Sequence, residues 1–124
     1  MKNTTIIARI LLGLLFVVFG ANIFFHFIPM PPPEATLAGD FSKALFKSHY
    51  LHLVGALQII GGLLLLVGYF VPLGLTLLGP VIVNILLFHL LLEPKGLPMA
   101  VGVAALALFL LGSYRANFAG LLKP

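Results

Sequence analysis

The chain has 124 residues, of which 61% are hydrophobic and 8% are charged, whereas soluble domains average about 45–50% and about 25%. This composition excludes a soluble catalytic domain, a nucleotide-binding domain and a nucleic-acid-binding module, because too few polar residues are present to cover any of them. The net charge of +4 comes from seven Lys and Arg residues scattered along the chain. We therefore interpret the basic character as topology information and expect no nucleic-acid partner.

Four apolar stretches are long enough to cross a bilayer, which takes about 20 residues per helix. They predict an all-α, integral membrane four-helix bundle that forms one domain over residues 1–124, with spans at residues 10–28, 49–71, 73–92 and 97–114. The first stretch also has features of a signal peptide, because Lys2 and Arg9 precede it. It is longer than a signal core of about 7–15 residues, so we interpret it as a span.

The longest connection covers residues 29–48 and forms the outer loop of this topology. Its proline-rich start favours an extended conformation, and Asp40 is expected to cap a short helix that rests on the bilayer surface or on the mouth of the bundle. A plain connection into the second span is the alternative. The links at residues 68–74 and 93–96 are short, so the spans that they join are expected to be antiparallel neighbours.

An even number of spans places both termini on one side of the membrane. Basic residues are slightly more numerous on that side than on the other. They are Lys2, Arg9, Arg115 and Lys123 on the terminal side, and Lys43, Lys47 and Lys95 on the loop side. This bias predicts cytoplasmic termini in a multi-pass protein of the inner (plasma) membrane.

Helix packing in lipid depends on small residues that let backbones approach and on a few polar side chains. The expected packing positions in the first two spans are Gly13, Gly20, Gly55, Gly61 and Gly62. Two polar residues are expected to be structural. Arg9 has a stem long enough to reach lipid phosphates, and Gln58, between two glycines, is suited to a hydrogen bond with a neighbouring backbone.

Other polar side chains within the spans gather towards the outer end. The candidate ligand-binding residues, expected to converge on one cavity, are Asn22, His26, His52, Asn84 and His89. Three interpretations stay open: hydrogen bonds between helices, a pocket for a quinone or another small amphipathic molecule, and a metal or haem site. For a metal, no carboxylate or thiolate lies at an obvious ligand spacing, so we assign no metal ligand.

No stand-alone catalytic motif is recognisable, and we assign no catalytic residue. The chain has no cysteine, which excludes thiol chemistry by the chain itself. A redox role would therefore depend on a cofactor, a quinone or a partner protein.

Several segments resemble the DoxX family of small membrane proteins with four spans. The matching segments are ARILLGLLFVVFG at 8–20, LQIIGGLLLLVG at 57–68, VPLG at 71–74, VNILLFH at 83–89 and the pair Tyr114-Arg115. The resemblance implies a four-helix membrane fold and links to quinol oxidation, thiosulfate–quinone chemistry, oxidative-stress complexes and the assembly of other membrane proteins. Many members have a glutamate where this chain has Gln58, which argues against a proton-linked role at that position.

From the resemblance we expect an accessory subunit or interaction protein attached to a membrane redox or stress-response system. Its expected partners are the lipid bilayer and other membrane or redox proteins. The alternative is a quinone- or small-amphiphile-binding component of a membrane oxidoreductase.

Overall fold

The structure, a computed structural model, describes residues 2–29 and 34–122. Four long helices dominate it: α1 (Lys2–Phe25), α3 (Tyr50–Val67), α4 (Val71–Leu91) and α5 (Leu97–Ser113). Shorter helices are α2 (Leu37–Lys47), α6 (Arg115–Phe118) and the 3₁₀ turns η1 (Pro94–Gly96) and η2 (Ala119–Leu122). The four long segments are apolar and long enough to cross a membrane, η1 counting with α5, which confirms the predicted all-α membrane fold.

Several helix ends differ from the predicted spans. Helix α1 begins at Lys2 rather than near Ile10, because the polar first turns are helical as well, and it ends at Phe25 because His26 adopts a left-handed backbone with φ of 52°. Helix α3 ends at Val67, and Gly68, with φ of 78°, caps it by donating its N–H to the carbonyl of Leu64. The turn into α4 is therefore three residues long, and Val71 belongs to α4.

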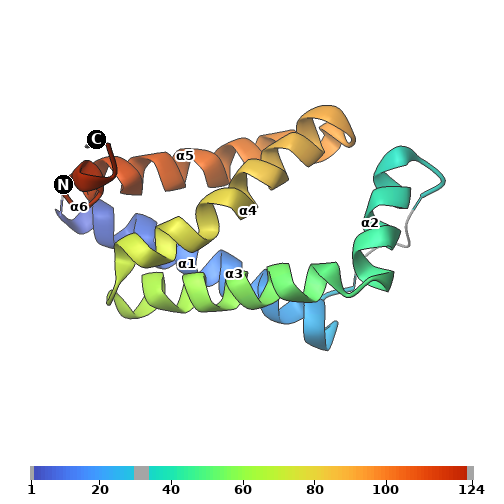
Figure 1. Cartoon of the computed structure of the whole chain (residues 1–124), viewed down its shortest axis with the longest axis horizontal. Coiled ribbons are helices and arrows are strands. Elements are labelled where there is room, and N and C mark those ends of the chain that lie inside the picture. Colours follow the sequence, from blue (N-terminus) through green and yellow to red (C-terminus); the bar gives the residue numbers. More distant parts are fainter. Residues whose placement is uncertain (1, 30–33, 123–124) are drawn as a thin grey trace.

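The predicted short helix in the outer loop is present as α2, but its N-cap is not Asp40. Thr36 caps it by accepting a hydrogen bond from the N–H of Gly39 at 3.1 Å, and Asp40 lies in the first turn. In Figure 1 α2 lies across the end of the bundle opposite the two termini.

The long helices pack in the order α1, α3, α4, α5, and α5 closes the ring against α1. Each is antiparallel to its neighbours, so both chain ends lie at one end of the bundle (Figure 1). Each helix contributes one completely buried leucine to the core: Leu12, Leu65, Leu78 and Leu110. Because all four lie nearer the terminal end of their helices, the tightest packing is in that half of the bundle.

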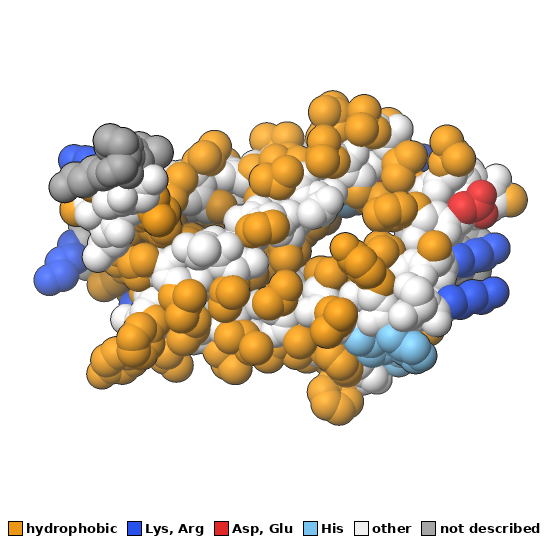
Figure 2. Space-filling model, in the orientation of Figure 1, with side chains coloured by type: hydrophobic (Ala, Val, Ile, Leu, Met, Phe, Trp, Pro, Cys, Tyr) orange, Lys and Arg blue, Asp and Glu red, His pale blue; other side chains and the backbone are white. Residues whose placement is uncertain are grey.

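The surface along the helices is apolar, as a bilayer requires. Figure 2 shows hydrophobic side chains over the length of the bundle, with basic side chains gathered at its two ends. Every long helix exposes large hydrophobic side chains that a soluble protein would bury, for example Ile7, Leu53, Leu91 and Leu108. Lipid therefore takes the place of a second apolar layer.

Glycines let α1, α3 and α4 approach to backbone contact. A Cβ atom on Gly13 would lie 2.8 Å from the carbonyl oxygen of Gly62, and a Cβ on Gly62 would lie 2.8 Å from that of Gly13. Gly20 lies in the same way against Gly55, and Gly61 against Gly74 of α4. Small residues thus set the spacing of these three helices.

Candidate functional site

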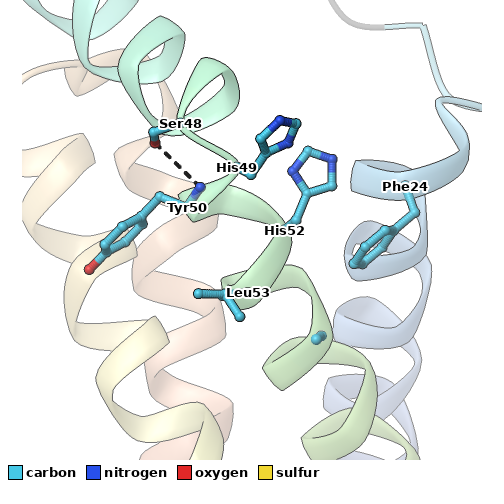
Figure 3. A pocket seen from close by; sticks show the side chains of 7 residues that line it. Phe24, Ser48, His49, Tyr50, His52 and Leu53 are labelled. Atoms are coloured by element: carbon cyan, nitrogen blue, oxygen red, sulfur yellow. Dashed lines mark hydrogen bonds between the residues drawn. The ribbon is translucent and has the colours of Figure 1, made fainter.

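The α2 end of the bundle carries an open pocket of about 590 Å³. Figure 3 shows its labelled residues, which come mostly from the start of α3 and from the end of α1. The lining residues are Phe24, Ser48, His49, Tyr50, His52, Leu53 and Ala56. We call this site the histidine pocket.

The histidine pocket changes from polar to apolar along α3. Ser48, His49 and His52 lie at the start of the helix, whereas Leu53 and Ala56 lie farther along it. From His49 to Ala56 the helix rises by about 10 Å towards the middle of the bundle. We call the polar part of the pocket, at the α2 end, the rim and the apolar part, farther along α3, the floor. Leu53 in the floor is an exposed side chain, so the floor is open to the lipid-facing surface.

His52 is the centre of a set of ring contacts at this rim. Its ring centroid lies 5.3 Å from that of Phe24 on α1, 5.7 Å from that of Phe46 on α2 and 5.2 Å from that of His49. His26, just after α1, lies 5.5 Å from Phe46. Three helices thus place their aromatic side chains around one imidazole.

The backbone near this rim is unusual. His26 (φ 52°) and His49 (φ 61°) both adopt the left-handed conformation, which costs a residue with a side chain about 1–2 kcal/mol. His49 is also the N-cap residue of α3, but its side chain makes no capping hydrogen bond. Histidine is among the residues that adopt this conformation more readily than most, and no side-chain cap from the described residues adds to the stability of either position.

The Nδ1 atom of His52 is buried and has no hydrogen-bond partner among the described residues. A buried polar atom without a partner costs about 1–3 kcal/mol. Because Nδ1 is enclosed by the protein, a ligand at the surface would reach this imidazole through the other ring nitrogen.

Asn22 has a local role at the end of α1. It is 5% exposed, and its Oδ1 accepts a hydrogen bond of 2.7 Å from the N–H of Ile28. The same turn is held by the N–H of His26, which donates to the carbonyl of Asn22. Asn22 therefore fixes the chain that carries His26 and does not line the histidine pocket.

His89 and Asn84 lie on α4, apart from the histidine pocket. The Nδ1 atom of His89 lies 3.1 Å from the backbone oxygen of Glu93 and 3.6 Å from its Oε1. The ring fills the space that a side chain at Gly96 would take, so His89 organises the turn between α4 and α5. Asn84 is exposed, and its Nδ2 donates 2.9 Å to the carbonyl oxygen of Pro80 in the same helix.

The structure therefore does not bring the five candidate residues into one cavity. It places His26 and His52 at one cluster and His89 at another, with Asn22 and Asn84 bonded within their own segments. Helix α2 joins the two clusters, because Phe46 contacts His26 and His52 while Phe41 lies 5.7 Å from Phe88, whose ring contacts His89.

The sequence interpretation left out Phe24, Phe46 and His49, which complete the surroundings of His52. The spacing of His49 and His52, three apart on one helix, was the available signal. Phe24 and Phe46 carry no such signal, since the chain has eleven phenylalanines. Among the described residues, no group of three His, Asp or Glu side chains is arranged to hold a metal ion.

Arg9 and Gln58 lie away from the pocket. The guanidinium of Arg9 occupies the space that a side chain at Gly68 would take, at the terminal end of α3, and its Nε is buried without a partner among the described residues. Gln58 is 8% exposed, and its Cβ lies close to Gly20. No hydrogen bond joins the Gln58 side chain to a described residue, and its structural role stays a prediction.

Residues 4–90, from α1 into the last turn of α4, match the sequence model of the DoxX family. Comparison with curated proteins and with solved structures gives no match. The matched residues contain Arg9, the packing glycines, Gln58 and the whole histidine pocket, and they make up well over half of the chain. The chain therefore belongs to the DoxX family.

Proposed function

We propose that this DoxX-family membrane protein is an accessory component of a membrane redox or stress-response system, and that it binds a small amphiphile in the histidine pocket. The observation that carries the proposal is the direction of the pocket, from His49 and His52 at the rim to Leu53 and Ala56 at the floor. An amphiphile in the outer half of the bilayer has the same direction, with its headgroup at the interface and its tail towards the core.

The chemistry of the rim fits a headgroup with hydrogen-bonding oxygens. Imidazole nitrogens donate to or accept from such oxygens, and the imidazoles of His49 and His52 line the pocket. The ring of Phe24, 5.3 Å from His52 in an edge-to-face arrangement, adds a surface for a flat headgroup such as a quinone. A quinone would also connect the pocket to the redox role that the family resemblance implies.

The binding step is tested by filling the floor of the pocket. Ala56→Phe places a ring where the tail would lie, and Ala105→Phe, on an exposed position of α5, is the matched control. We expect decylubiquinone to raise the unfolding temperature of the parent and of Ala105→Phe, and to leave that of Ala56→Phe unchanged. Circular dichroism at 222 nm measures unfolding. An equal response of all three proteins would contradict the proposed site.

The cellular role is tested separately. In a strain that lacks the protein, the parent and Ala105→Phe should restore growth under oxidant stress, whereas Ala56→Phe, present at the same level in the membrane, should not. Full restoration by Ala56→Phe would show that the pocket has no part in the cellular role, and no growth defect in the strain itself would contradict the stress-response assignment.

A further inference from the structure

Two basic side chains lie on the helix next to the histidine pocket. Helix α2 carries two exposed lysines, Lys43 and Lys47, one helical turn apart. Lys47 is two residues from His49, so their Cα atoms are at most about 8 Å apart. Figure 2 shows the histidine side chains beside basic side chains at this end of the molecule. Charges within about one Debye length, roughly 8–10 Å, act on a headgroup at the rim.

The acidic side chains at this end of the bundle lie outside the histidine pocket. Among the described residues, no Asp or Glu lines the histidine pocket. Asp40 lies in the first turn of α2, three residues before Lys43 and seven before Lys47, and Glu34 precedes that helix. Glu93 lies beside His89 at the turn between α4 and α5. Lys43 therefore has Asp40 as an acidic neighbour on its own helix face, whereas Lys47, which is nearer to His49 in the chain, has no acid within one turn of it on α2.

The polar groups at the rim also favour an acceptor-rich headgroup. The hydroxyl of Ser48 is already engaged, since it donates to the carbonyl of Leu45 and accepts from the N–H of Tyr50. The imidazoles of His49 and His52 remain as donors. A charged acceptor gains about twice as much from such donors as a neutral carbonyl does.

We infer that the histidine pocket selects an amphiphile with an acidic headgroup, a carboxylate or a phosphate on a single alkyl tail, which Lys43 and Lys47 hold at the rim. This inference rests on the proposed function, because it names the headgroup class of the same pocket. The acidic oxygens accept from His49 and His52, the lysines neutralise their charge, and the tail lies along Leu53 and Ala56.

The test compares two probes that share one tail, dodecyl phosphate and dodecanol. The full chain is reconstituted in phosphatidylcholine nanodiscs, and the rise of its unfolding temperature with probe concentration gives an apparent Kd for each probe. We expect dodecyl phosphate to bind at least about tenfold more tightly than dodecanol. In the double variant Lys43→Gln/Lys47→Gln, the ratio should fall below about threefold.

Two control variants separate local charge from general charge and from misfolding. Lys95→Gln removes an exposed lysine in the turn between α4 and α5, outside the pocket, and should keep the parent's ratio. Lys43→Arg/Lys47→Arg keeps both charges and should also keep it. A fall of the ratio in Lys95→Gln as large as in the double variant would overturn the inference, because surface charge alone would explain the preference.

The remaining outcomes distinguish this inference from the proposed function. If dodecanol binds as tightly as dodecyl phosphate, or if the double variant keeps the preference, the acidic headgroup is overturned. If decylubiquinone binds in a manner that Ala56→Phe abolishes while dodecyl phosphate does not bind, the inference fails and the proposed function stands. If none of the three probes binds the parent, both fail.

Discussion

At the scale of single residues, two of the histidines at or near the pocket have an unusual, left-handed backbone conformation. Among the described residues other than glycine, His26, His49 and Phe70 have positive φ. Phe70 lies in the turn before α4, whereas the two histidines lie beside the pocket. Strained residues of this kind gather at functional sites, where a ligand uses the side chain.

His49→Gly should therefore stabilise the protein and weaken binding. Glycine adopts φ of 61° without strain, so we expect the free energy of unfolding to rise by up to about 1 kcal/mol, while the decylubiquinone-dependent rise in unfolding temperature shrinks. Phe70→Gly relieves the same strain far from the pocket and should leave the ligand response unchanged. A parental ligand response in His49→Gly would remove His49 from the site.

The contact of Gly13 with Gly62 makes a second prediction. Gly62→Ala places a methyl group 2.8 Å from a backbone oxygen of α1, which has no side-chain freedom with which to move away. We expect a loss of about 1–3 kcal/mol in thermal unfolding followed by circular dichroism. Gly102→Ala on α5, where no atom lies within 4 Å, should be neutral or slightly stabilising. Equal effects of the two variants would show that α1 and α3 are farther apart.

Gln58→Leu is expected to be neutral or to stabilise the protein by up to about 1 kcal/mol. The residue is 8% exposed and its amide forms no hydrogen bond with a described residue, so leucine of similar size replaces a polar group between apolar helices without breaking a bond. Thermal unfolding in detergent decides the sign. A loss above about 1 kcal/mol would mean that the amide has a partner, such as a bound molecule.

Sequence reasoning reached the packing positions more easily than the pocket. Gly13 and Gly62 stand out because few residues other than glycine allow backbone contact. The neighbours of His52 depend on how far each helix rotates about its axis. Because α1 and α3 are apolar on all sides, no hydrophobic pattern fixes that rotation, and His89 was wrongly expected beside His52. The rotation follows from the glycine contacts, which only the three-dimensional structure reveals.

At the scale of elements, α2 is the helix that the sequence described least well. Asp40 predicted an N-cap at a position that lies inside the helix, whereas Thr36 starts the helix one turn earlier. Thr36 satisfies an N–H of the first turn, and Asp40 then lies near the positive end of the helix. Helix α2 holds Phe41 and Phe46 against the bundle, so its stability sets the geometry at the rim.

Thr36→Ala should loosen α2 without unfolding the bundle. Loss of an N-cap costs about 0.5–2 kcal/mol, so we expect amide hydrogens of residues 37–47 to exchange about five times faster while those of α3 keep their rates. Ser42→Ala, in the same helix, is the control. Hydrogen exchange with mass spectrometry gives both rates, and unchanged exchange in α2 would exclude the capping role of Thr36.

At the scale of the whole molecule, the sequence predicted the number of spans, because uninterrupted apolar stretches of about 20 residues are typical of membrane-spanning helices. The core was less predictable. It lies towards the terminal half, around Leu12, Leu65, Leu78 and Leu110, and the α2 end is held by ring contacts instead. The pocket is therefore in the half of the bundle where side chains have room to accept a ligand.

Orientation in the membrane remains a prediction, and the lack of cysteine makes it easy to test. Lys95→Cys should react with an impermeant thiol reagent added outside intact cells, whereas Gly120→Cys, exposed at the terminal end, should react only after the membrane is opened. The reverse order would invert the orientation. Labelling of both from outside would contradict an even number of crossings.

Both chain ends lie at the end of the bundle opposite the histidine pocket. A genetic tandem can therefore join the end of one copy to the start of a second through a soluble linker, with no additional crossing helix, and both copies keep the same direction in the membrane. Such a tandem, with Ala56→Phe in one copy alone, would carry one intact and one blocked pocket in a single polypeptide. Binding stoichiometry then becomes an internal comparison that does not depend on how much protein each cell produces.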